Sequence, residues 1–115
     1  MGGALFEGMI ISEAWKAFFN CGQRPAAFFW RSHGGLEVDL IIQSQGKFWP
    51  MEIKLTSTPS VNHTKPIERF KQMAGKDTSK QGFIICNVGE KRNLPGNNVA
   101  LPWFEFPEQL KRIIA

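Results

Sequence analysis

Two short apolar segments, residues 36–43 and 47–55, constrain the fold of this chain more than any other feature. Both are rich in branched and aromatic side chains, which are typical of β-strands. Only Ser44, Gln45 and Gly46 separate them, so we predict a tight turn and an antiparallel hairpin. Pro50 removes one backbone donor from the second segment, and we expect an irregularity or a local bulge there.

Helical and strand-like segments surround this hairpin. Residues 4–20 carry apolar side chains at helical spacing, with Asn20 and Gly22 as stop signals. The other predicted elements are strands at 26–31, 82–88 and 99–104, a turn-rich loop at 89–98, and helices at 66–74 (ending at Gly75) and 107–114. This order, αβββαββα, predicts an α/β (or α+β) domain in which helices flank a mixed central sheet.

Length and composition limit the class of protein. The chain has 115 residues, of which 43% are hydrophobic, and this fits one domain with a real core. Its apolar runs are far shorter than the ~20 residues of a membrane helix. A net charge of +4 favours an anionic partner such as nucleic acid only weakly. Cys21 and Cys86 lack disulfide or metal spacing, which indicates reduced thiols and a cytoplasmic protein.

One acidic residue of the first helix is out of place. Glu7 falls in the middle of one broad apolar arc of the helix, which is formed by Phe6, Ile10, Ile11, Ala14, Ala17 and Phe18. A carboxylate in a core-facing position is costly unless it is paired or binds a metal. Glu13, at the edge of the arc, either supports Glu7 or bonds a basic residue.

The two hairpin strands bring further charged residues together, because successive side chains of a strand alternate between its faces. On one strand Val38, Leu40 and Ile42 are expected to point one way, and Glu37, Asp39 and Ile41 the other. On the next strand Met51, Ile53 and Leu55 are expected to share one face, and Glu52, Lys54 and Thr56 the other.

Asp39, Glu52 and Lys54 can therefore lie side by side. Two carboxylates from neighbouring strands suit a hard cation such as Mg²⁺ or Mn²⁺. A nearby lysine could orient an attacking water or stabilise negative charge on a phosphate. The alternative is a half-exposed hairpin with ordinary surface charges, in which Glu37 is solvated or pairs with Lys54 or Arg31.

Basic and aromatic residues offer weaker indications. Five basic residues surround the second helix and could follow a nucleic-acid backbone, or could form an ordinary solvated face: Lys65, Arg69, Lys71, Lys76 and Lys80. Trp30, Trp49 and Trp103 fall in predicted strands, and we expect them in the core. For Trp49, beside Pro50, stacking on unpaired bases is the alternative.

Asp39, followed by Glu52-Ile53-Lys54 on the next strand, resembles the PD-(D/E)XK nuclease superfamily. Three segments, GALFEGMIISEAWK, FFWRSHGGLEVDLII and GKFWPMEIKLT, resemble the C-terminal domain of unknown function attached to bacterial and archaeal AAA-type ATPases. This resemblance covers residues 3–75. It implies a restriction-endonuclease-like fold, with Asp39, Glu52 and Glu7 as ligands of Mg²⁺ or Mn²⁺ and Lys54 as the catalytic lysine.

The sequence departs from these families in two ways. Val38 replaces the proline that gives the superfamily its name, and no phosphate-binding loop GxxxxGK[ST] occurs in the chain. We therefore expect one nuclease-like domain spanning residues 1–115, a C-terminal fragment of a longer ATPase-type protein. The expected function is metal-dependent cleavage of DNA. The alternative is an inactive module that binds nucleic acid or protein, with an ATPase domain in cis or a second copy of itself as partner.

Overall fold

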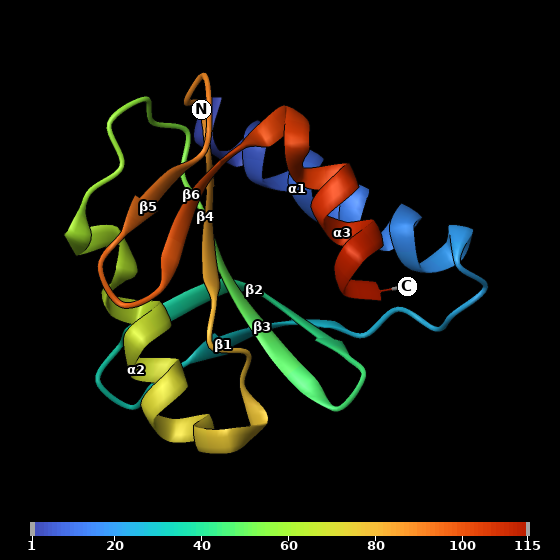
Figure 1. Cartoon of the computed structure of the whole chain (residues 1–115), viewed down its shortest axis with the longest axis horizontal. Coiled ribbons are helices and arrows are strands. Elements are labelled where there is room, and N and C mark those ends of the chain that lie inside the picture. Colours follow the sequence, from blue (N-terminus) through green and yellow to red (C-terminus); the bar gives the residue numbers. More distant parts are fainter. Residues whose placement is uncertain (1, 115) are drawn as a thin grey trace.

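The computed structural model describes residues 2–114, so Met1 and Ala115 of the expected domain lie outside the described residues. It contains a mixed central sheet flanked by helices, as predicted, but the sheet has six strands where the sequence predicts five (Figure 1). The elements are α1 (Gly2–Asn20), β1 (Ala27–Arg31), β2 (Glu37–Ser44), β3 (Lys47–Ile53), α2 (Lys65–Ala74), β4 (Gly82–Cys86), β5 (Arg92–Leu94), β6 (Asn98–Pro102) and α3 (Phe106–Ile114), with short 3-10 turns at Val61–Thr64, Gly75–Asp77 and Trp103–Glu105.

The strands lie in the order β1-β2-β3-β4-β6-β5. The first three form the predicted antiparallel meander, β3, β4 and β6 run parallel, and β5 is antiparallel to β6. β5 corrects the prediction, which placed residues 89–98 in a loop. It has only three residues, Arg92, Asn93 and Leu94, and is too short and polar to show a strand pattern.

The helices divide between the two faces of the sheet. α1 and α3 pack together on one face, and α2 covers the other (Figure 1). The main core lies under α1 and α3, and a smaller apolar layer lies under α2 around Ile67 and Phe70. In α1 the buried positions are Phe6, Ile10, Ala14 and Phe18, four residues apart as a core-facing helix requires.

Glycines and one glutamine terminate elements where the backbone enters the left-handed region. α1 ends before Gly22, with φ of 68°, and the N–H of Gln23 donates to the carbonyl of Phe18 at 3.0 Å. Gln45 and Gly46, with φ of 54° and 78°, form the tight turn between β2 and β3. Within residues 2–114, no helix is both long and apolar enough to cross a membrane.

The bulge predicted at Pro50 is wrong. Pro50 pairs with Ile41 in an unbroken β2–β3 register, and the parallel ladder with β4 begins one residue later, at Met51. The irregularity lies instead in the β1–β2 pairing, between Phe28 and Trp30. This irregularity also explains why Val38 faces the side of the sheet opposite to the predicted one.

Val38 packs with Ile41 and Phe70 on the α2 side of the sheet, whereas Leu40 and Ile42 face the core under α1 and α3. Strict alternation had placed Val38 with Leu40. The register shift in the pairing with β1 breaks the alternation at this end of β2.

β3 and β6 end earlier than predicted, and this moves one lysine and one tryptophan out of the strands. β3 ends at Ile53, so Lys54 lies just past its last residue. β6 ends at Pro102, so Trp103 belongs to a 3-10 turn and is 40% exposed, contrary to the core position expected for it. Trp30 and Trp49 do lie in strands and are half-buried.

Candidate active site

The candidate site forms where the pairing of β2 with β3 gives way to side-chain contacts. Residue pairing in this ladder stops at Leu40 and Met51. Beyond that pair, the backbone N–H of Asp39 donates to Glu52 Oε2 at 3.0 Å, and the backbone N–H of Ile53 donates to Asp39 Oδ2 at 2.9 Å. Each carboxylate thus accepts from the opposite strand, and this exchange holds the two carboxyl groups side by side.

Glu52 is the more deeply buried of the pair, at 2% exposure. Its pKa is raised to about 8. Burial is the largest cause of this rise, and the negative charge of Asp39 is the second largest. The backbone hydrogen bond from Asp39 and the positive charge of Lys54 act in the opposite direction but do not prevail. At neutral pH, in the absence of a cation, Glu52 therefore holds a proton.

Lys54 supplies the positive group of the cluster. Its Nζ lies 3.7 Å from Asp39 Oδ2, and 41% of its side chain is exposed. Its backbone N–H donates to the carbonyl of Ile85 at 3.0 Å, which anchors it to the end of β4. The ammonium group therefore contacts a carboxylate while remaining open to an incoming anion.

The acidic residues of α1 do not join this cluster. Glu7 is half-buried beside Phe6, and within residues 2–114 no three His, Cys, Asp or Glu side chains are grouped so that they could hold a metal. Glu13 lies 3.5 Å from Lys16 and so bonds a basic residue. The role of Glu7 as a third ligand stays a prediction.

Glu37 forms an ion pair with Arg31 across β1 and β2. This pairing is one of the alternatives that the sequence left open, and it turns Glu37 toward β1. The structure thus brings together Asp39, Glu52 and Lys54, and it gives cationic partners to both secondary candidates, Glu13 and Glu37.

The paired carboxyl groups suit a small divalent cation. Mg²⁺ is commonly held by one or two carboxylates, with water completing its coordination. Asp39 and Glu52 offer hard oxygen donors from two fixed strands. Because burial and the charge of Asp39 raise the pKa of Glu52, a cation that binds there has to displace a proton from this carboxyl group.

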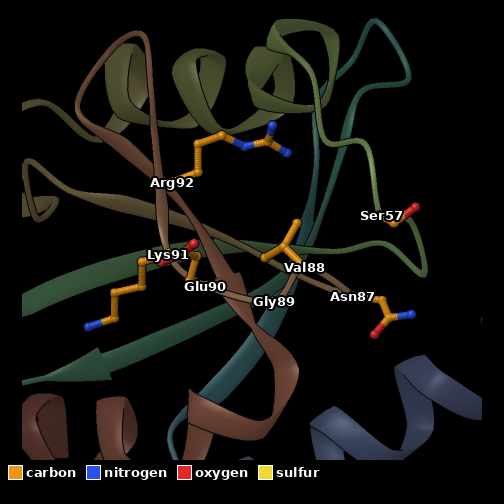
Figure 2. Close-up of a pocket in the computed structure, with 7 residues that line it drawn as sticks. All are labelled: Ser57, Asn87, Val88, Gly89, Glu90, Lys91 and Arg92. Carbon is orange, nitrogen blue, oxygen red and sulfur yellow. The ribbon is translucent and has the colours of Figure 1, made fainter.

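Sequence reasoning missed a pocket of about 460 Å³ at this end of the sheet (Figure 2). The loop after β3 contributes Ser57, the connection from β4 to β5 contributes residues 87–91, and β5 contributes Arg92. The N–H of Asn87 donates to the carbonyl of Thr56 at 2.8 Å, so the segment that carries Lys54 continues directly into the pocket wall.

Arg92 is the most distinctive residue of this pocket. Its side chain points toward α2 in Figure 2, and its positive charge acts on Cys86. It forms no ion pair with a carboxylate of residues 2–114, whereas the neighbouring Lys91 lies 3.9 Å from Glu105. The available signal was a charged run directly after a buried strand, at the carboxyl end of a parallel pair where ligands commonly bind.

One of three comparisons with known proteins found a match. A family model described as "Domain of unknown function (DUF4143)" matches residues 2–106, from the start of α1 to the start of α3. No curated protein and no solved structure matches the sequence. The matched range includes Asp39, Glu52 and Lys54, and the family description assigns no activity to them. Since the match spans nearly all of the sequence, the chain belongs to the DUF4143 family.

Proposed function

We propose that Asp39, Glu52 and Lys54 form a divalent-cation-dependent phosphodiesterase site that acts on DNA. The observation that carries the proposal is the reciprocal bonding of Asp39 and Glu52 at the end of the β2–β3 ladder, with Lys54 3.7 Å away. The resemblance to PD-(D/E)XK nucleases concerns the same three residues.

A structural role alone explains this cluster poorly. Glu52 is almost completely buried beside a second carboxyl group, and such an arrangement lowers stability once both groups are ionised. An apolar residue would serve a purely structural strand end better. Strongly perturbed carboxyl groups that lie beside an exposed cation are characteristic of functional sites.

The chemistry follows from the positions of the side chains. A divalent cation, when bound, polarises a phosphodiester and makes water more acidic. Asp39 and Glu52 would hold that cation, while the exposed ammonium of Lys54 would face the phosphate oxygens or orient the attacking water. The pocket beside Lys54 adds Arg92, whose planar guanidinium suits an adjacent phosphate.

Cleavage of plasmid and branched DNA with Mg²⁺ or Mn²⁺ tests the proposal. We expect Asp39→Ala and Lys54→Ala each to reduce the rate by about 100-fold or more, because each removes a group that acts on the transition state. Glu108→Ala and Lys111→Ala are matched controls, since this exposed pair lies on α3. Activity that survives both site substitutions would refute the assignment.

One observation favours a second candidate, an inactive module that binds nucleic acid or protein as part of a larger ATPase-type protein. Within the described residues the cluster has two carboxylates and no third acidic ligand, and a shared fold does not require a shared activity. Wild-type protein that binds Mn²⁺ but cleaves no DNA would support this candidate.

A further inference from the structure

A groove of about 820 Å³ lies at the opposite end of β3 from the carboxylates. Its walls come from the start of β3, the segment between α2 and β4, and the turn between β5 and β6. We call it the lysine groove, because Lys47, Lys71, Lys76 and Lys80 line it together with Trp49. Trp49 and Lys47 precede Glu52 by three and five residues in β3, so at ~3.3 Å per residue they lie roughly 10 Å and 16 Å from it along the strand.

Three of the four lysines in the lysine groove have no carboxylate partner among the described residues. No Asp or Glu is among the described residues that line it. Glu68 lies 3.4 Å from Lys71, but Lys47, Lys76 and Lys80 form no ion pair with a carboxylate of residues 2–114. Three like charges around one concave surface repel one another, and an anion in the groove would relieve that repulsion.

The groove is also preorganised. Lys47 Nζ donates to the carbonyl of Lys76 at 2.7 Å, which connects β3 to the segment after α2. Lys71 Nζ donates to the carbonyl of Gly96 at 2.9 Å and to Asn98 Oδ1 at 3.1 Å, which connects α2 to the β5–β6 turn. These bonds fix the walls, while Lys76 and Lys80 are exposed.

Trp49 gives the groove an aromatic wall. Its ring is half-buried and stacks on Phe83, with 6.4 Å between ring centroids and 23° between planes. A fixed aromatic ring among lysines can stack on a base while the ammonium groups contact phosphates. Only an unpaired base offers its face for such stacking, so the combination favours a single strand over a duplex.

We propose that the lysine groove binds single-stranded nucleic acid, with phosphates on Lys76 and Lys80 and an unpaired base on Trp49. This binding needs no metal and does not rest on the cleavage activity proposed above. The groove would hold a strand at one end of the sheet, at a distance from the carboxylates at the other end.

Fluorescence anisotropy of a labelled 12-nucleotide oligothymidylate, measured with the full chain in EDTA, tests this proposal. The double substitution Lys76→Glu/Lys80→Glu should weaken binding by about tenfold or more and flatten its salt dependence, because each lost phosphate contact removes a slope of ~0.7. Lys16→Glu/Lys111→Glu changes the net charge equally on α1 and α3, and should change the affinity less than about threefold.

Trp49 provides a second readout. Oligothymidylate should quench tryptophan fluorescence, Trp49→Leu should weaken binding by about fivefold or more, and Trp49→Phe should restore much of it, since base stacking needs only an aromatic face. Circular dichroism of each variant verifies its fold. Because EDTA removes divalent cations from the assay, the result is separate from that of the catalytic site.

Three results would overturn the proposal. The first is equal binding by the groove variant and its charge-matched control. The second is competition by polyglutamate as effective as that by unlabelled oligothymidylate, which would reveal general anion binding. The third is duplex DNA binding as tightly as the single strand, which would exclude a role for the Trp49 ring.

Discussion

At the scale of single residues, Glu52 connects the stability of the fold to the proposed chemistry. Its pKa is raised from 4.5 to about 8 in the folded chain. Below pH 4.5 the carboxyl is protonated in both the folded and unfolded states, and its contribution to stability is fully present. Between pH 4.5 and 8 the folded chain holds a proton that the unfolded chain has lost, so stability falls as pH rises.

Glu52→Gln should remove this dependence. Glutamine keeps an oxygen that can accept from the Asp39 N–H but carries no titratable proton. We expect the free energy of unfolding of the wild type to fall by several kcal/mol between pH 5 and 8, at up to ~1.4 kcal/mol per unit. The variant should lack most of that fall.

Urea unfolding at pH 5, 6.5 and 8 measures the effect of Glu52→Gln, with Glu108→Gln as an exposed control. Equal slopes in wild type and Glu52→Gln would contradict the burial of an ionisable pair. A steeper fall in the control than in the wild type would show that another group dominates.

The sequence predicts Asp39, Glu52 and Lys54 as neighbours because side-chain alternation in a hairpin is local. It does not predict which face of the sheet Val38 occupies, since the register shift that turns this residue toward α2 depends on the pairing with β1. Arg92 was missed because its segment has no strand pattern. Its pocket adjoins the segment of Lys54 only because backbone hydrogen bonds join residues 54–56 to residues 85–87.

At the scale of elements, a close approach of α2 to β4 supports the sheet that carries the site. A Cβ atom on Gly82 would lie 2.6 Å from Ile67 Cγ2 and 2.5 Å from Asn98 Oδ1. Both side chains are buried, so neither can move freely. The position therefore requires glycine for space.

Gly82→Ala should destabilise the protein by about 1–3 kcal/mol through overpacking. Gly8→Ala is the matched control, because a Cβ there meets nothing within 4 Å on an exposed face of α1. Alanine in a helix interior stabilises by roughly 0.5–1 kcal/mol relative to glycine. Thermal unfolding of both variants measures these effects. An unchanged or raised melting temperature for Gly82→Ala would contradict the close contact of Gly82 with Ile67 and Asn98.

The elements were predictable to different degrees. The long helix, the hairpin and the buried strand β4 have clear periodicity or tight turns, and their bounds agree with the prediction within two residues. β5 forms because β6 lies beside it, and its three residues carry no pattern of their own. Pro50 suggested a bulge, but its place one residue before the β3–β4 ladder leaves the register unbroken.

At the scale of the whole molecule, the two ends of the sheet present different chemistry. The carboxyl ends of β3 and β4 carry Lys54 and the pocket with Arg92, while the start of β3 opens onto the lysine groove. The net charge of +4 favours an anionic partner only weakly, but the sequence also predicts a basic region around the second helix that includes Lys71, Lys76 and Lys80 of the groove. The addition of Lys47 and Trp49 to this region required the tertiary fold, because β3 is distant from it in the sequence.

The central claim is that Asp39 and Glu52 together hold a divalent cation. Mn²⁺ titration of the wild type and of Asp39→Asn, followed by calorimetry and by melting temperature at pH 6 and pH 8, tests it most directly. The wild type should bind Mn²⁺ more tightly at pH 8 and release a proton on binding at pH 6, because Glu52 must lose its proton to a metal. Asp39→Asn should bind at least tenfold more weakly, since it lacks one of the two charged ligands. A wild type that shows neither heat of binding nor a shift in melting temperature with millimolar Mn²⁺ at either pH would contradict the claim.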